Sequence, residues 1–197
     1  MQEQQIPGYT FGTKEVPKSP LSLAELESLK KSLIFGENDI KYLKMSQSIL
    51  ADQTEAILDV WYGFVGSTPE LLHYFKNSKT GEPDGNYLNV VRKRFGQWIL
   101  DTAGANYDQK WLDYQYEIGL RHAPDKKNKT DQVDSVAFIN FRYIIALTIP
   151  VTTTLRSFLA NKGASAEDVD QMHAAWVKSV LLQTILWSQP FIKDSLF

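Results

Sequence analysis

Hydrophobic residues recur every three or four positions along most of this chain, the spacing that places them on one face of an α-helix. No segment alternates hydrophobic and polar residues as a half-buried β-strand would. The pattern therefore predicts an all-α protein with about seven helices of unequal length. Their expected bounds are about residues 22–36, 38–66, 67–75, 87–102, 108–122, 135–161 and 166–189.

Residues with capping side chains indicate where several of these helices begin. Ser22 followed by Glu25 has the spacing of a capping box, and Asp108 precedes the helix that ends at His122. Asn38 is the expected cap of the second helix, which the pattern continues without a break to Gly66. Helices of such unequal length favour a globin-like arrangement of crossed helices over a four-helix bundle.

The first twenty residues differ from the rest of the chain, because proline and glycine recur there and no helical period is present. We expect residues 1–20 to form an irregular arm. A chain of 197 residues with 43% hydrophobic content is long enough to fill one core. We therefore expect residues 1–197 to form a single domain.

Composition narrows the classes of function. The formal charge is −2 and the basic residues are scattered, so there is no electrostatic footprint for nucleic acid or an anionic membrane. The chain has no cysteine, which excludes thiolate nucleophiles, zinc–thiolate sites and iron–sulfur clusters. No apolar run reaches the roughly 18 residues that span a bilayer, and the first residues lack the features of a secretion signal. We expect a cytoplasmic protein without nucleic-acid or membrane partners.

One of the three histidines lies at a distinctive place. At 100° per residue, His122 falls on the same helix face as Trp111, Gln115 and Ile118, so it points where the apolar stripe points. One interpretation is structural, since a cationic histidine complements the negative end of the helix dipole. The other is that the imidazole projects into a pocket as a ligand. Haem iron would suit that role, because it needs one protein nitrogen and a large apolar cleft.

The chain is rich in aromatic residues, which make up 12% of it. Several of them could form a second, histidine-free wall of such a cleft, although each is also a plausible core residue. These residues are Trp61, Tyr62, Phe64, Phe75 and Phe95.

Five segments together resemble one known family. They are IPGYTFG, LDVWYGFVGS, VRKRFGQWILDT, WLDYQYEIGLRH and LLQTILWSQPF. In this order they resemble the protoglobins, single-domain haem proteins related to the sensor domains of globin-coupled sensors, from about residue 6 to about residue 192. The resemblance implies a modified globin fold with an added N-terminal helix and an arm that covers the haem. It also implies a homodimer formed largely through the last two long helices.

The resemblance also implies roles for individual residues. His122 would be the proximal ligand of the iron of haem b, and Trp61 and Tyr62 would form the distal pair. Phe95 would share the distal pocket, and Phe75 would pack on the face of the haem.

Further site residues are expected at the edges of the pocket. Propionate groups need cationic or polar partners, and Arg94 and Arg121 are the candidates. The chain departs from the family at two positions. Ala123 stands where a second histidine is common, and Leu147 stands at what looks like an aromatic position near the pocket.

The implied function is reversible binding of small diatomic gases, namely dioxygen, carbon monoxide and nitric oxide. Two alternatives remain open. The first is a haem enzyme that turns over nitric oxide and dioxygen or another reactive small molecule, because the iron itself carries that chemistry. The aromatic wall is poorly suited to peroxidase chemistry, because it has no histidine backed by arginine to act as the acid and base. The second is a gas sensor that signals through a partner.

Overall fold

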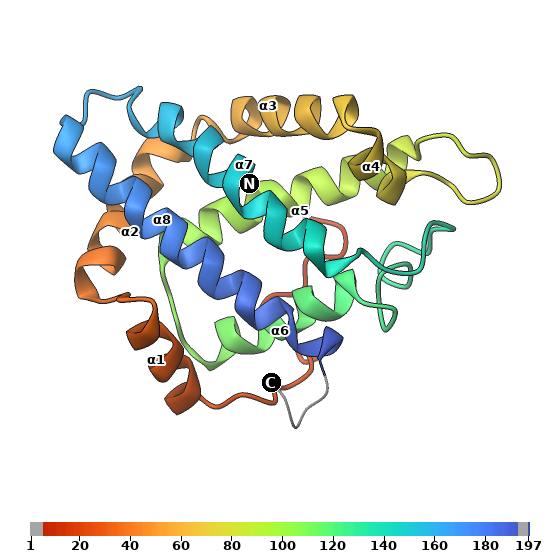
Figure 1. Ribbon diagram of the computed structural model, residues 1–197, viewed down its shortest axis with the longest axis horizontal. Helices are drawn as coiled ribbons and strands as arrows, with labels where there is room; N and C mark the ends of the chain where they lie inside the picture. The colour runs from red at the N-terminus through yellow and green to blue at the C-terminus, as the bar shows by residue number, and fades with distance from the viewer. Residues whose placement is uncertain (1–5, 193–196) are drawn as a thin grey trace.

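The computed structural model describes residues 6–192 and Phe197, and within them the protein consists of helices and connecting segments (Figure 1). The all-α prediction is confirmed. The helices are α1 (Leu23–Ser32), α2 (Glu37–Leu50), α3 (Thr54–Ser67), α4 (Pro69–Leu72), α5 (Gly85–Gly104), α6 (Gln109–His122), α7 (Phe141–Leu159) and α8 (Ala166–Trp187), with 3₁₀ helices η1 (His73–Phe75) and η2 (Gln189–Phe191). None of these helices is both long and apolar enough to cross a membrane.

Two of the predicted helix starts are confirmed by their caps. In the capping box before α1, the backbone N–H of Ser22 donates to Glu25 Oε2 at 2.8 Å, and the N–H of Glu25 donates to Ser22 Oγ. Before α6, Asp108 Oδ1 accepts from the N–H of Trp111 at 2.8 Å. These caps satisfy backbone donors that have no partner inside their own helix.

The prediction of one long helix from Asn38 to Gly66 is wrong, because α2 ends at Leu50 and α3 begins at Thr54. The side chain of Gln53 explains the break. Its Nε2 donates to the carbonyl of Ile49 at 2.7 Å, an acceptor that a continuous helix would use, and to the carbonyl of Phe158 on α7 at 3.0 Å. The break is therefore stabilised by a tertiary contact.

The predicted N-cap of the second helix is also wrong. Gly36, and not Asn38, is the N-cap residue of α2, and its backbone N–H donates to Asp39 Oδ2 at 2.8 Å. Asp39 in turn accepts from Lys178 Nζ of α8 at 2.9 Å. This ion pair ties the start of α2 to α8.

Helix α7 begins six residues later than predicted. The preceding segment forms hydrogen bonds to other parts of the chain, since Ser135 Oγ donates to the Tyr74 carbonyl and the N–H of Ile139 donates to the His122 carbonyl at 2.9 Å. The Ile139 N–H is therefore not free to donate to the Ser135 carbonyl, as it would in a helix that began at residue 135. The segment is instead fixed beside the end of α6.

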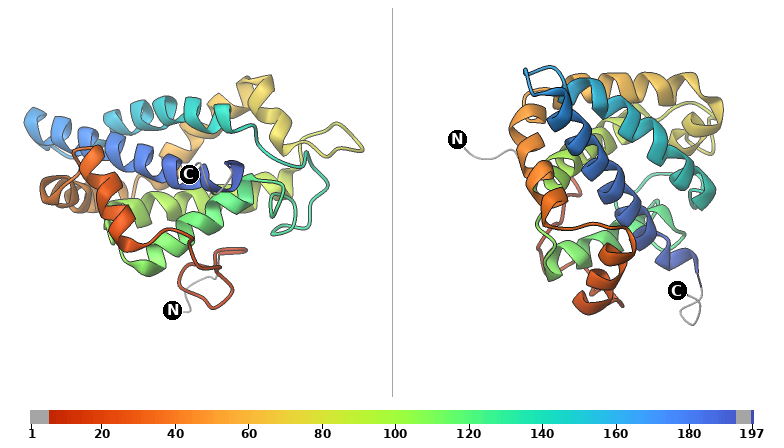
Figure 2. Two further views of the ribbon diagram at one scale, coloured as in Figure 1. Left: turned by 60° about the horizontal axis from the view of Figure 1, so that its bottom comes forward. Right: turned by 60° about the vertical axis from the view of Figure 1, so that its left-hand side comes forward.

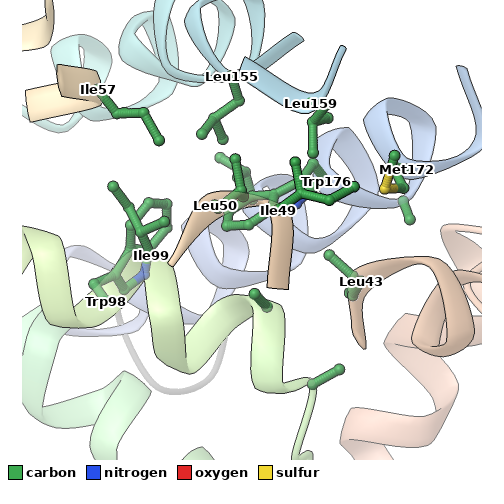
Figure 3. Close-up of a cluster of buried hydrophobic side chains, with 14 of the residues drawn as sticks. Leu43, Ile49, Leu50, Ile57, Trp98, Ile99, Leu155, Leu159, Met172 and Trp176 are labelled. Atoms are coloured by element: carbon green, nitrogen blue, oxygen red, sulfur yellow. The ribbon is translucent and has the colours of Figure 1, made fainter. Parts of the chain in front are cut away.

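Helix α8 packs against α2, α6 and α7, and Figure 1 shows α7 and α8 as an antiparallel pair. The main core lies where α2, α3, α5, α7 and α8 meet, and its side chains point toward one another (Figure 3). Trp176 of α8 is fully buried there, and its Nε1–H donates to Ser46 Oγ of α2 at 2.9 Å. Burial of each large apolar side chain contributes about 1.5–3 kcal/mol.

Residues 6–20 of the expected irregular arm precede α1 and lie outside the helices, close to α6 (Figure 2), while residues 1–5 lie outside the described residues. Asp113 of α6 holds its second half, because it accepts from Lys18 Nζ at 2.8 Å and from the N–H of Ser19 at 2.9 Å. The first half packs on α6 through aromatic rings, with Phe11 and Tyr114 at a centroid distance of 5.3 Å. The described part of the arm is thus bound to α6 near both of its ends.

Candidate functional site

A cavity of about 260 Å³ lies among α3, η1, α5, α6, α7 and α8, and its lining is mainly apolar. It brings together residues that are far apart in the sequence. All eight site residues expected from the sequence line it, namely Trp61, Tyr62, Phe75, Arg94, Phe95, Arg121, His122 and Leu147.

His122 is the last residue of α6 and lines the cavity. Its Nδ1 lies 2.7 Å from the carbonyl oxygen of Ile118. A carbonyl only accepts, so Nδ1 carries the proton and donates, and Nε2 keeps its lone pair. Among the described residues Nε2 has no hydrogen-bond partner. This is the arrangement in which a histidine binds a metal through Nε2.

The electrostatics of His122 favour the neutral ring. Burial lowers its pKa from 6.5 to about 4, and the hydrogen bond to Ile118 only partly opposes this shift. A neutral imidazole has no charge to place against the negative end of the helix dipole, so at neutral pH the contact that remains for a structural role is the hydrogen bond to the Ile118 carbonyl. Arg121 remains as the cation in the last turn of α6.

Trp187, the last residue of α8, lies against the His122 ring, with the two centroids 5.6 Å apart. Its Nε1–H donates to Gln115 Oε1 at 2.8 Å, which fixes the indole on α6. Sequence reasoning did not assign Trp187 to the site. A signal was present, because Val180, Thr184 and Trp187 have helical spacing and all three line the cavity.

The opposite wall is aromatic and free of histidine. The rings of Trp61 and Phe95 meet edge to face at a centroid distance of 5.5 Å, and those of Tyr62 and Phe75 meet at 6.5 Å. Phe64 is the exception among the expected wall residues, since it is 39% exposed and does not line the cavity.

The Tyr62 hydroxyl is a donor available to this cavity. It has no hydrogen-bond partner among the described residues, so it is not a core phenol bonded to a backbone carbonyl. Burial raises the pKa of Tyr62 above its ordinary value, although Arg92 and Arg94 oppose the shift. The hydroxyl therefore stays protonated at neutral pH and can donate a hydrogen bond.

The two arginines at the edge of the cavity are already paired. Arg94 makes a bidentate ion pair with Asp131, at 2.8 and 2.6 Å, and its Nη1 also donates to the Pro7 carbonyl at 3.0 Å. Arg121 donates from Nε to Glu117 at 2.9 Å. Its terminal nitrogens donate to the arm, at the Gly8 carbonyl and at Thr10 Oγ1. Both guanidinium groups thus clamp the arm beside the cavity.

Tyr9 of the arm lines the cavity between these two clamps. Its hydroxyl donates to Asp101 Oδ2 at 2.8 Å, and its ring meets that of Tyr114 edge to face. Tyr9 was not predicted as a site residue. The aromatic residues of the arm were a usable signal, because an irregular segment otherwise has little reason to carry them.

Leu147 lines the cavity from α7, together with Tyr143 and Val151, one turn away on either side. Ala123, the other departure from the family pattern, is fully buried directly after α6. Neither of the remaining histidines lines the cavity: His73 is exposed, and His173 Nε2 donates to the Thr152 carbonyl at 3.1 Å.

Comparison with solved structures gives a match to the globin domain of the Geobacter sulfurreducens globin-coupled sensor. The TM-score is 0.65, with 16% identity, and the match covers 85% of this chain and 97% of that chain. It confirms the globin-like fold that the helix lengths predicted. No curated protein sequence matches the chain.

A family comparison extends over most of the sequence, because the Protoglobin family model matches residues 22–196. That range includes α1 to α8 and every lining residue of the cavity except Tyr9. The resemblance noted from five sequence segments is thereby confirmed. The chain belongs to the protoglobin family, which supports a role as a haem globin that binds gas.

Proposed function

We propose that this protein holds haem b in the described cavity, with His122 as the axial ligand of the iron, and that it binds dioxygen, carbon monoxide and nitric oxide reversibly. The single observation that carries the proposal is the state of His122. Its ring is neutral, its Nδ1 is occupied by the Ile118 carbonyl, and its unpartnered Nε2 belongs to a residue that lines an apolar cavity.

The residues of the cavity fit the cofactor. A porphyrin needs a large apolar surface on both faces, which the aromatic rings of α3, α5 and η1 and the aliphatic side chains of α7 supply. The bound haem would supply an iron with one open coordination position. His122 would determine the electron density at that iron, because its Nδ1–H donates to a carbonyl and so makes Nε2 more basic.

Tyr62 would favour polar gas ligands. Tyr62 lines the cavity, and its hydroxyl has no protein acceptor among the described residues, so donation to a gas ligand would not break an existing bond. Such a hydrogen bond is worth about 1 kcal/mol net. Trp61 and Phe95, whose rings are in contact, line the same cavity with apolar bulk.

We further propose that two copies associate through α7 and α8. Both helices carry large apolar side chains on the surface of the single chain, including Ile145 and Ile149 on α7 and Val177 and Leu181 on α8. Ile149 is 67% exposed, which is costly for an isoleucine in the middle of a helix unless another surface covers it.

Absorption spectroscopy tests the proposal. Protein prepared with haem is compared with His122→Ala and with His73→Ala, whose histidine lies outside the cavity. We expect ferrous and carbon monoxide Soret bands in the parent and in His73→Ala. His122→Ala should lose them or recover them only with added imidazole. A folded parent without a Soret band would overturn haem binding, and an unchanged spectrum in His122→Ala would overturn the ligand assignment.

A further inference from the structure

The loop after α6 places a buried lysine in the wall of the cavity. Lys127 is 3% exposed and lines the cavity together with Tyr74 and Tyr87. Its Nζ donates to the Tyr74 carbonyl at 3.2 Å and lies 3.5 Å from Asn128 Oδ1. No carboxylate of the described residues lies within 4.0 Å of this ammonium group.

The other charged groups of the cavity wall have partners. Arg94 is paired with Asp131 and Arg121 with Glu117, while Asp101 accepts from the Tyr9 hydroxyl. Among the described residues, Lys127 is thus the cation of this wall that has no carboxylate in direct contact; Asp131, whose charge acts on it, is ion-paired with Arg94.

A buried ammonium group without a counter-ion is unfavourable, because the apolar surroundings do not replace its hydration. Burial lowers the pKa of Lys127 to about 8, so the group still carries its charge at neutral pH. The ring of Tyr87, 4.9 Å from Nζ, compensates for part of the lost hydration. The unfavourable charge of Lys127 lies in the wall of the cavity proposed to hold the cofactor. An anionic group of the cofactor would neutralise it.

We propose that Lys127 binds one propionate carboxylate of the cofactor, in place of the partners Arg94 and Arg121 expected from the sequence. The assignment rests on the proposed binding of haem. An ammonium group and a carboxylate are complementary in charge, and their hydrogen bond is strong where water is excluded. The two arginines keep a different role, as the clamps of the arm.

Lys127→Met separates this role from a structural one. Methionine has a similar length without the charge, and the Tyr74 carbonyl keeps Ser135 Oγ as a donor at 3.1 Å. The variant therefore removes a buried charge, leaves the Tyr74 carbonyl with a donor, and gives up only the long 3.5 Å contact to Asn128 Oδ1. The empty protein should melt at the same or a higher temperature, while the loaded protein should lose haem faster.

The experiment is a two-by-two comparison of parent and Lys127→Met, each loaded with haem or with haem dimethyl ester, whose propionates are uncharged. The rate of cofactor transfer to excess apomyoglobin is measured. We expect Lys127→Met to release haem between about 10-fold and about 100-fold faster, and to release the ester at nearly the parent rate. Lys129→Met, from an exposed lysine outside the cavity, should match the parent with both cofactors.

Other results would overturn the assignment. Equal acceleration for haem and for the ester would show a packing role, and unchanged release of haem would show no role. If Lys127→Met does not fold, Lys127→Gln is compared in the same way and must show the same selectivity for charged propionates. A parent without a Soret band with either cofactor would instead refute haem binding itself, and the assignment with it.

Discussion

The indole of Trp187 and the imidazole of His122 lie nearly parallel, with planes inclined by 19° and centroids 5.6 Å apart. Both rings are held by α6. Gln115 accepts from the indole N–H, and the Ile118 carbonyl accepts from the imidazole Nδ1–H. The orientation of His122 about its side-chain bonds is therefore restricted on one face by an aromatic ring that α8 carries into the site.

Gly119 sets the distance between the two helices at this point, and we predict that Gly119→Ala destabilises the protein. A Cβ atom at residue 119 would lie 3.1 Å from both Cα and the carbonyl oxygen of Trp187, so the backbone of α8 would have to move. We expect the free energy of unfolding to fall by about 1–3 kcal/mol, measured by urea denaturation of the haem-free protein.

Gly63→Ala is the matched control for this substitution. Gly63 also lies inside a helix, but nothing lies within 4 Å of the added Cβ atom. Alanine should raise the free energy of unfolding by about 0.5–1 kcal/mol there, because glycine is the poorer helix former. Equal effects at the two positions would contradict the close approach of α6 and α8.

The second prediction concerns Tyr62. Tyr62→Phe removes the hydroxyl and keeps the ring that packs against Phe75. Loss of a hydrogen bond of about 1 kcal/mol should make dissociation of dioxygen about five-fold faster in stopped-flow measurements. Carbon monoxide is less polar when bound and should be affected far less. Equal changes for the two gases would refute the hydrogen bond.

Tyr107→Phe is the control for general effects of losing a buried hydroxyl. Tyr107 is hydrogen-bonded to Ser179 at 3.0 Å and does not line the cavity. Its removal should lower stability without changing the kinetics of either gas.

Features that depend on neighbouring residues could be predicted from the sequence. The caps at Ser22 and Asp108 are local, because donor and acceptor lie three residues apart. The break between α2 and α3 is not local, since it depends on a bond from Gln53 to a carbonyl about one hundred residues later. The same reason explains the late start of α7, which is fixed by Tyr74 and His122.

In the candidate site, too, some features could be predicted from the sequence and others could not. The helical period and the family resemblance placed eight residues, and all eight line the cavity. The pairing of Arg94 with Asp131 could not be read from the sequence, because charged residues are common near both positions. Lys127 was missed for the same reason, since a lysine in a charged loop is usually exposed.

The third prediction concerns the arm. Arg121→Met removes the donors to the Gly8 carbonyl and Thr10 Oγ1, while Lys126 Nζ remains to pair with buried Glu117 at 2.6 Å. Hydrogen exchange at the amides of Tyr9 and Thr13, which donate within the arm, should become roughly ten-fold faster.

Arg92→Met provides the comparison for the arm. Arg92 pairs with Glu55 and Asp59 on α3, away from the arm, so exchange at Tyr9 and Thr13 should match the parent. If Arg121→Met also leaves these amides unchanged, the arm is held by its aromatic contacts and not by the clamp.

The fourth prediction concerns association. Ile149→Glu places a charge on the exposed face of α7, where burial against a second copy would leave it without a partner. We expect sedimentation to show a dimer for the parent and a monomer for this variant. Ile34→Glu, at an 82% exposed isoleucine between α1 and α2, should remain dimeric. If Ile149→Glu and Ile34→Glu are both monomeric, or both dimeric, the interface is not at Ile149.

The last prediction is a pH dependence of the haem-free protein. The pKa of Lys127 is about 8 in the folded state and 10.5 as a free side chain. Below pH 8 both states are charged and folding carries the full cost of the buried charge. Between pH 8 and 10.5 the unfolded state binds more protons, so stability rises with pH. The total gain is about 3 kcal/mol.

Ionisation of buried tyrosines lowers the stability of the protein as the pH rises over part of this range. Burial raises the pKa of Tyr62, Tyr87 and Tyr107, so these side chains ionise first in the unfolded state and stability falls as they do. The difference between Lys127→Met and the parent removes this contribution, because the tyrosines are common to both. Urea denaturation should show the variant more stable below pH 8 and the two proteins converging near pH 10.5. A difference that does not change with pH would refute the lowered pKa of Lys127.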